Sequence, residues 1–292
     1  MPVITELARA KINLTLEVLG RRPDGFHELL SLVAFAGLSD TVRLDLDGPT
    51  GVHVDGAFGS AIATHNLVDV TLRLLHETEP RLRLGHVHLT KKLPVAAGVG
   101  GGSADAAAVL RAVRLANPDL GDHVAWHGLA ARLGADVPVC LESRAAWIGG
   151  TGDKVWPLAE PLPPMNVVLV NPLVPVPADK TAQVFRRLEA PSLADVGPIA
   201  ERRERSIRTS AQLIHLMRER ANDLEAAASA VVPQVAEVMA ALSARPGMEI
   251  ARLSGAGPTC FGVFASEDAA AAAAAALRAA HPGWWVEATG LT

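Results

Sequence analysis

The sequence predicts a two-domain protein of the α+β class. Its 292 residues exceed one typical domain and fall short of three. The first ninety residues favour strands, and the later part of the chain carries helical and strand patterns in mixed order. The proline-rich stretch 157–164 is the natural boundary between them. We therefore expect an N-terminal domain over residues 1–160 and a C-terminal domain over residues 161–292.

The N-terminal ninety residues indicate strands joined by turns. Apolar residues alternate with polar or small ones over 12–18 and again over 42–46, which is the pattern of half-buried strands. The period changes to that of a helix over 66–77, and another strand is expected around 87–89. This strand runs into Pro94, where a glycine-rich segment begins.

A helix is expected directly after the glycine-rich segment, over 103–116. Ser103 can cap its N-terminus, and Asp105 suits its first turn, where an acidic side chain complements the helix dipole. A second helix is expected over 124–133. It ends at Gly134, because glycine readily adopts the left-handed conformation of a helix C-cap.

The remaining elements complete an α+β order. Strands are expected over 137–141 and 145–148. Beyond the proline-rich stretch, the expected elements are a strand over 166–170, a helix over 181–188, further helices to residue 244, two strands around 254–257, a helix through the alanine run 269–276, and a last strand near Trp285.

Composition and charge exclude several classes of protein. Apolar residues make up 49% and charged residues 20%, which is globular rather than disordered composition. A net charge of −4 disfavours a general nucleic-acid binder, which needs a basic surface. The two cysteines, Cys140 and Cys260, are expected to be reduced core thiols. Because no apolar run reaches about 20 residues, we expect no membrane span and a soluble, cytoplasmic protein.

The glycine-rich segment from Pro94 to Ser103 predicts a phosphate-binding loop. Glycines let the backbone approach an anion closely, and the N-terminus of a following helix adds partial positive charge. A P-loop is excluded because no glycine in the chain is followed by lysine. The dinucleotide fingerprint fails because Ser103 stands at its sixth position. A flexible turn is the alternative, and the flanking strand and helix disfavour it.

Two charged residues stand in otherwise apolar surroundings and are candidates for catalysis. Phosphoryl transfer needs an acceptor hydroxyl that is aligned or deprotonated and phosphates that are neutralised. Asp136 lies in a turn between an expected helix and an expected strand, where it is either a capping residue or a general base. Lys11 interrupts an apolar strand, where it is either a surface group with a buried stem or a catalytic cation.

Six blocks in this order resemble the GHMP kinase superfamily, named for galactose, homoserine, mevalonate and phosphomevalonate kinases. The resemblance spans almost the whole chain. The blocks are AKINL from Ala10 to Leu14, RPDGFHEL from Arg22 to Leu29, the glycine loop continuing as GGGSADAA, GADVP from Gly134 to Pro138, NDLE from Asn222 to Glu225, and SGAGPTCF from Ser254 to Phe261.

The resemblance implies a fold and a reaction. The expected fold joins an N-terminal domain like ribosomal protein S5 domain 2 to a ferredoxin-like C-terminal domain. The expected reaction transfers the γ-phosphate of ATP to an alcohol, with Asp136 as the base and Lys11 lowering the pKa of the hydroxyl. Mg²⁺ would accompany ATP, with Ser103 beside it. The loop residues implied to hold ATP are Pro94, Val95, Ala96, Ala97, Gly98, Val99, Gly100, Gly101, Gly102, Ser103 and Ala104.

The RPDGFHEL block resembles the branch of the superfamily that acts on a cytidine diphosphate-linked methylerythritol, at its 2-hydroxyl. His27 would then hydrogen-bond the cytosine, with Phe26 and Phe185 on its opposite faces. Phe26 stands where the family usually has tyrosine, and this chain contains no tyrosine. Stacking survives that change, whereas a hydroxyl hydrogen bond is lost.

The remaining contacts of the small-molecule substrate are implied in the same way. Asn13 would contact it, and a loop with Gly255 and Gly257 would close on the reacting phosphates. No nucleic acid or membrane partner is expected, and the chain should be a monomer or a weak homodimer.

Two alternatives stay open. A homoserine or mevalonate kinase is disfavoured by the block around His27, because those substrates carry no cytidine. A catalytically silent relative is disfavoured by the presence of Lys11, Asp136 and the complete loop.

Overall fold

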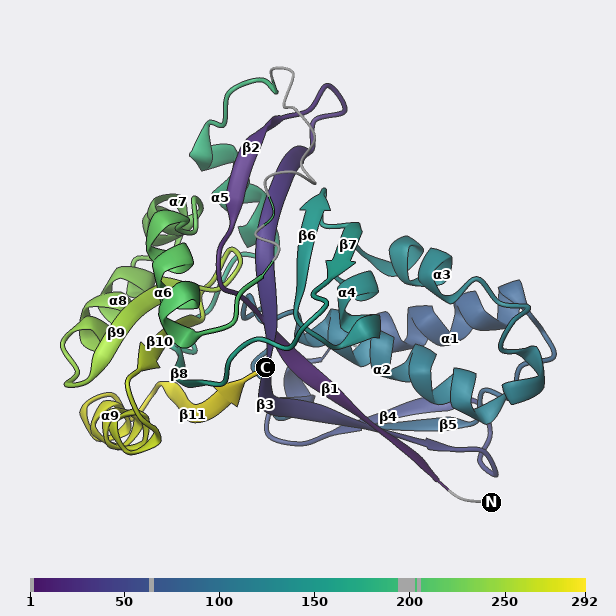
Figure 1. Cartoon of the computed structure of the whole chain (residues 1–292). Helices are drawn as coiled ribbons and strands as arrows, with labels where there is room; N and C mark the ends of the chain where they lie inside the picture. Colours follow the sequence, from purple (N-terminus) through teal and green to yellow (C-terminus); the bar gives the residue numbers. More distant parts are fainter. Residues whose placement is uncertain (1–2, 63–65, 194–202, 204–205) are drawn as a thin grey trace. The chain divides into compact units, whose positions relative to one another are not determined.

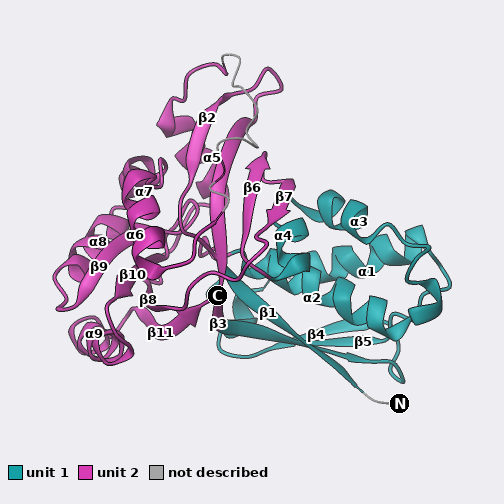
Figure 2. Cartoon of the chain, in the orientation of Figure 1, with its two compact units in different colours: residues 1–11, 38–95, 100–143 teal, residues 12–37, 96–99, 144–292 magenta. Residues whose placement is uncertain are grey.

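The computed structural model describes residues 3–62, 66–193, 203 and 206–292 (Figure 1). It divides into two compact units, each built from separate segments of the chain (Figure 2). Unit 1 contains residues 1–11, 38–95 and 100–143, and unit 2 contains residues 12–37, 96–99 and 144–292. Strands β1 (Ile4–Asn13) and β3 (His27–Asp45) contribute residues to both units. These discontinuous units do not follow a single cut at residue 160, which stays a prediction.

The sheet of unit 1 is built around the second half of β3. Residues 41–45 of β3 pair antiparallel with β5 (His86–Thr90), and β5 pairs parallel with β4 (Gly51–Asp55). Val42 and Leu44 are fully buried, so the alternation over 42–46 does mark a strand. The strand begins much earlier than expected, at His27.

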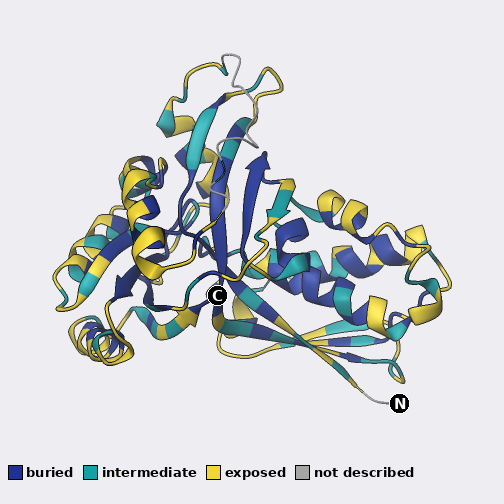
Figure 3. Cartoon of the chain, in the orientation of Figure 1, coloured by how far each residue is buried: buried dark blue, intermediate teal, exposed yellow. Residues whose placement is uncertain are grey.

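Helices fill the rest of unit 1 and pack on one another. They are α1 (Leu67–Thr78), α2 (Gly101–Ala116), α3 (Trp126–Leu133) and α4 (Val137–Glu142), with short 3₁₀ turns η1 (Gly59–Ala61) and η2 (Pro118–Leu120). Helix α2 contacts α1, α3 and α4, and most of its length is buried (Figure 3). Its small alanine side chains allow this close helix packing while retaining high helix propensity.

Three expectations about element types and helix caps in this unit are wrong. The segment 137–141 forms helix α4 rather than a strand. Its short apolar run fits either element, and Pro138 stands in the first helical turn, where proline is tolerated. Ser103 is not the N-cap of α2, because the helix begins two residues earlier and Gly100 caps it. Gly134 does end α3, but in an extended rather than a left-handed conformation.

Unit 2 contains an antiparallel sheet in the order β11–β8–β10–β9. These strands are β8 (Met165–Asn171), β9 (Met248–Leu253), β10 (Cys260–Phe264) and β11 (Trp285–Leu291). Helices α8 (Gln234–Ser243) and α9 (Glu267–Ala280) contact these strands. Ser266 caps α9 by accepting a hydrogen bond from the Ala269 N–H, as the alanine-rich segment predicts.

The first half of β3 lies between β2 (Glu17–Arg21) and the pair formed by β6 (Ala146–Gly150) and β7 (Lys154–Pro157) in unit 2. It pairs antiparallel with β2 and with β6, and β6 pairs with β7. The strand expected over 12–18 is in fact divided between the end of β1 and the start of β2. The other helices are α5 (Lys180–Leu188), α6 (Ser210–Glu219) and α7 (Glu225–Val231).

The α+β class is confirmed by this arrangement. Both cysteines are buried free thiols, as expected. Within the described ranges, no helix has the length and apolar composition needed to cross a bilayer.

Candidate active site

Lys11 and Asp136 form an ion pair in unit 1. The Lys11 Nζ atom lies 2.7 Å from Asp136 Oδ1 and donates a hydrogen bond to it. Strand β1 supplies Lys11, and Asp136 immediately precedes α4. The lysine side chain is 5% exposed, whereas the aspartate side chain is 36% exposed. A buried cation therefore holds a carboxylate that a solute can still reach.

The N-terminus of α2 lies directly against Lys11. Gly100, the N-cap, has a φ of +64°, and a Cβ atom on it would stand 3.3 Å from Lys11 Cβ. Glycine meets both constraints, because it adopts positive φ freely and has no side chain to collide. The first backbone hydrogen bond of α2 is donated by the Ala104 N–H to Gly100 O at 2.8 Å. The N–H groups of residues 101–103 thus lack intrahelical acceptors and can bind an anion.

The preceding part of the glycine loop, residues 96–99, is fastened to the loop 254–259 within unit 2. Ser254 Oγ donates to Gly98 O at 3.0 Å, and the Thr259 N–H donates to Ala97 O at 3.0 Å. A Cβ atom on Gly98 would lie 2.6 Å from Ser254 O, so only glycine fits this approach. The structure thus brings the loop carrying Gly255 and Gly257 against the glycine loop.

Asn13 also reaches this loop. Its side-chain amide donates to Ser31 Oγ at 2.8 Å, and its backbone N–H donates to Ser254 Oγ at 3.3 Å. The side chain is buried, yet its Oδ1 atom has no hydrogen-bond partner. A buried acceptor without a donor is costly, so Oδ1 is suited to accept a hydrogen bond from a ligand hydroxyl.

A cavity of about 780 Å³ lies in unit 2 between the β2–β3 hairpin and α5. His27 and Phe185 line it, and their rings stack with centroids 4.8 Å apart and planes 26° apart. Phe26 is 64% exposed and also lines it. Phe185 therefore lies on His27 itself, whereas the sequence predicts that it faces Phe26 across a base.

The His27 imidazole is suited to recognise a neutral base. Burial, and secondarily the charge of Arg21, lower the pKa of His27 below its usual value. A neutral imidazole offers one N–H donor and one nitrogen acceptor, which matches the mixed donor and acceptor edge of a pyrimidine. An aromatic cavity of this volume lies in the usual range of small-molecule sites.

Comparison with known proteins places the chain in a family. The family model for the GHMP kinases N terminal domain matches residues 66–144, and the model for GHMP kinases C terminal matches residues 199–283. A 4-diphosphocytidyl-2-C-methyl-D-erythritol kinase of Methylobacterium radiotolerans is 47% identical over 99% of both chains. One of Cereibacter sphaeroides is 48% identical over 96% of both. The chain belongs to the 4-diphosphocytidyl-2-C-methyl-D-erythritol kinase family of GHMP kinases.

Solved structures agree with this family. A crystal structure of 4-(cytidine 5'-diphospho)-2C-methyl-D-erythritol kinase matches 99% of both chains with a TM-score of 0.71 and 32% identity. A homoserine kinase from Cytophaga hutchinsonii matches with a TM-score of 0.67 but only 18% identity, so it shows the shared fold alone. The resemblance to GHMP kinases and the expected fold are both confirmed.

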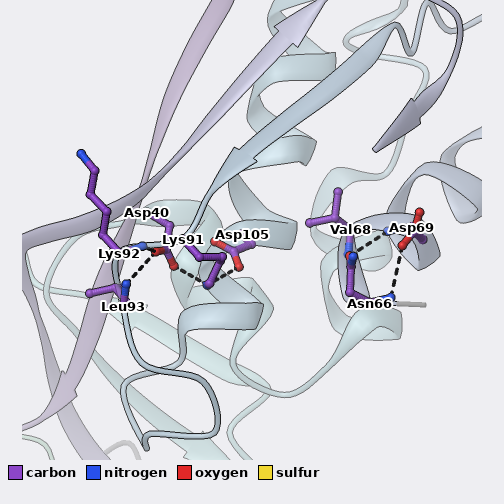
Figure 4. Close-up of polar contacts among 8 residues, drawn as sticks. All are labelled: Asp40, Asn66, Val68, Asp69, Lys91, Lys92, Leu93 and Asp105. Atoms are coloured by element: carbon purple, nitrogen blue, oxygen red, sulfur yellow. Dashed lines mark hydrogen bonds and ion pairs between the residues drawn. The ribbon is translucent and has the colours of Figure 1, made fainter. Parts of the chain in front are cut away.

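A buried charge cluster beneath the start of α2 is a feature of this GHMP kinase that the sequence did not reveal (Figure 4). Lys91 contacts both Asp40 and Asp105, the latter at 2.6 Å, and all three side chains are almost fully buried. Asp40 also accepts the N–H of Leu93 at 2.8 Å, which fixes the chain leading into the glycine loop. A Cβ atom on Gly101 would lie 3.6 Å from Lys91 Nζ, so the cluster directly supports the first turn of α2.

The cluster holds one cation and two carboxyl groups, and its charge depends on Asp105. Burial raises the pKa of Asp105 to about 7, against the opposing effect of Lys91. Burial alone would lower the pKa of Lys91, but the two carboxyl groups outweigh it and the pKa is raised. Sequence patterns placed Asp105 in the first turn of the helix, which is wrong because α2 begins at Gly101 and has no acidic residue in its first turn. These patterns also do not report that Asp105 is buried.

The pH dependence of stability should follow Asp105. Its folded-state pKa is raised, so the group favours the folded state when protonated, and that contribution is lost as pH rises toward about 7. Between about pH 5 and about pH 8, the wild type should lose about 2–3 kcal/mol relative to Asp105→Asn. Urea unfolding at several pH values measures this difference, with the exposed acid Asp122→Asn as the control. If the difference in unfolding free energy between the wild type and Asp105→Asn does not change with pH, Asp105 stays ionised throughout this range and the prediction is contradicted.

Proposed function

We propose that this chain transfers the γ-phosphoryl group of ATP to the 2-hydroxyl of 4-diphosphocytidyl-2-C-methyl-D-erythritol, a step of non-mevalonate isoprenoid precursor biosynthesis. The observation that carries the proposal is the Lys11–Asp136 ion pair beside Gly100 and the N-terminus of α2. It combines a reachable carboxylate, a fixed cation and free backbone N–H groups in one unit. The names of the relatives described above support the same acceptor.

The proposed chemistry is an in-line transfer. The 2-oxygen of the acceptor forms a bond to the γ-phosphorus as the bond from that phosphorus to the β–γ bridging oxygen breaks, and ADP leaves. Asp136 accepts or orients the hydroxyl proton, and the Lys11 ammonium stabilises negative charge that develops on the oxygen. The N–H groups at the start of α2 hold phosphate oxygens, and the glycines of the loop allow their close approach.

In this proposal Mg²⁺ is bound mainly by the phosphates of ATP and not by a dedicated set of protein ligands. Among the described residues, no group of three histidine, cysteine, aspartate or glutamate side chains could hold a metal ion. This fits Mg²⁺, which keeps several waters and binds mainly to substrate phosphates. The Ser103 hydroxyl, in the first turn of α2, is the proposed protein contact. The ion would neutralise charge on the transferring phosphoryl group.

The cavity of unit 2 is the proposed cytidine site. His27 would hydrogen-bond the cytosine, Phe26 and Phe185 would contact its ring, and Asn13 Oδ1 would accept a hydrogen bond from the polyol. Homoserine and mevalonate contain no aromatic base, so this cavity favours the cytidyl acceptor over those of the sister kinases. The expected cytoplasmic location and monomeric or weakly dimeric state stay predictions.

The acceptor should be tested by direct competition between substrates. We expect ADP release from ATP with the cytidyl substrate, and rates at least 100-fold lower with homoserine or mevalonate, because only the first fills the aromatic cavity. A coupled assay of ADP measures all three. Turnover with homoserine or mevalonate alone would contradict the proposed acceptor.

Asp136→Ala should bind ATP normally but lose most turnover. The change removes the group that handles the hydroxyl proton, a contribution of about 10²–10⁴ in rate for general bases. Steady-state kinetics and ADP binding measure the two effects, with the exposed acid Asp122→Ala as a matched control. Near-normal turnover in Asp136→Ala would contradict its proposed role.

Phe185→Ala should raise KM for the cytidyl substrate about tenfold and leave KM for ATP unchanged. The substitution removes the ring that packs in the cavity, and an aromatic contact of this kind is worth about 1 kcal/mol beyond its buried area. The KM for ATP is the internal control. Equal changes in both KM values would indicate a general structural effect instead of a base contact.

A further inference from the structure

Lys180 is a buried cation that the proposed chemistry does not use. It is the first residue of α5 and is only 5% exposed. Its ammonium group contacts three carbonyl oxygens in unit 2: Gly257 O, Ala256 O at 3.2 Å and Ala96 O at 3.5 Å. An ammonium has three N–H donors, so these contacts occupy all of them.

The position is unfavourable for a lysine on two grounds. No carboxylate among the residues that the structure describes forms an ion pair with Lys180, and burial lowers its pKa to about 8. The charge also stands at the N-terminus of α5, the end of a helix where its dipole disfavours a cation. An apolar side chain of the same size would avoid both costs. An apolar side chain would, however, leave three carbonyl oxygens without this donor, so the contacts with these carbonyl groups are the reason for a lysine here.

The carbonyl groups that Lys180 binds belong to two loops that the sequence predicts to bind phosphate. Ala96 lies in the glycine loop, and Ala256 and Gly257 lie in the loop 254–257. Ala96 has a φ of +54°, a left-handed conformation that costs a non-glycine residue roughly 1 kcal/mol or more. The lysine binds this strained residue to the second loop.

The orientation of one peptide group links Lys180 to an anion site. The peptide bond between Ala96 and Ala97 is trans, so its N–H points opposite to its carbonyl oxygen. Because the carbonyl faces Lys180, the Ala97 N–H faces away from it. The ammonium thus holds a backbone donor that points away from it and places a buried positive charge on the opposite side of this peptide group.

We propose that Lys180 is a positioning residue for the nucleotide polyphosphate, which holds the glycine loop and the loop 254–257 in their phosphate-binding conformation and supplies charge from behind them. It acts through the loop backbone and does not touch the ligand. The inference rests on the proposed function only in that the ligand is a nucleoside polyphosphate.

Substitution by an apolar residue of similar length tests this proposal. Lys180→Met should still fold, because removal of a buried charge that has no carboxylate partner offsets the loss of the hydrogen bonds to three carbonyl oxygens. Its dissociation constant for ADP, measured by calorimetry, should rise at least about tenfold. KM for the cytidyl substrate should stay unchanged. Lys154→Met removes an exposed lysine of the same unit and should change neither property.

The outcomes separate this proposal from the proposed function. ADP affinity in Lys180→Met within twofold of the wild type would overturn the role of Lys180, whichever alcohol is the acceptor. A wild type that binds ADP but phosphorylates only another alcohol would contradict the acceptor and leave the role of Lys180 supported by its own measurement. A wild type that binds no ADP would overturn both.

A pH profile keeps the proposal testable if Lys180→Met does not fold. The protonated lysine favours an anionic ligand, so ADP affinity should be full below about pH 8 and fall as pH rises above it. The other charged groups on the elements around Lys180 are Asp179 at the N-cap of α5, Arg186 on α5 and Glu225 on α7. Hydrogen bonds lower the pKa of Asp179, burial lowers that of His27, and burial raises that of Glu225. The alkaline decrease should vanish in Lys180→Gln. A profile that is flat in the wild type, or that persists in Lys180→Gln, would overturn the proposal.

Discussion

The contact between Gly100 and Lys11 is the constraint on which the proposed chemistry of unit 1 depends. It sets the start of α2, and with it three free N–H groups, next to the lysine that holds Asp136. A Cβ atom at Gly100 would lie only 3.3 Å from Lys11 Cβ, a tight contact, and the substituted residue would also have to adopt positive φ. The helix proposed to bind phosphate and the aspartate proposed as general base are thus both positioned next to Lys11, so displacing either would disturb the other.

Three buried lysines around the glycine loop differ in what balances their charge. Lys11 has one carboxylate, Lys91 has two carboxyl groups, and Lys180 has only carbonyl oxygens among its described contacts. The first pair is neutral and has an open carboxylate, which suits proton transfer. The Lys91 cluster is neutral when Asp105 is protonated and negative when it is ionised, and it supports the first turn of α2. Only the third leaves a net positive charge, so it alone can add attraction for a polyphosphate without first losing a partner.

Local sequence patterns predicted the structural context of the glycine loop, because that context is set by short-range features of the backbone. The strand before it, the helix after it and the glycines within it are all short-range features, and the structure confirms them. The run at 137–141 was wrongly predicted as a strand because five apolar residues do not distinguish two periods. The clusters around Lys91 and Lys180 could not be predicted, because the partners of each lysine come from distant segments of the chain. A charged side chain that becomes buried also does not contribute to a hydrophobic pattern. The two compact units could not be predicted either, because each is assembled from segments that are distant in the sequence.

The division of polar and aromatic residues between the units suggests how binding energy is used. The cavity beside His27 and Phe185 is proposed to bind the distal base, an interaction equally available before and during the reaction. Lys11 and Asp136 interact with groups whose charge changes during transfer, so their contribution grows in the transition state. In the proposed mechanism, recognition of the acceptor and acceleration of its phosphorylation therefore rest on separate residues. A substitution in the aromatic cavity, such as Phe185→Ala, should then affect binding of the acceptor more than the chemical step.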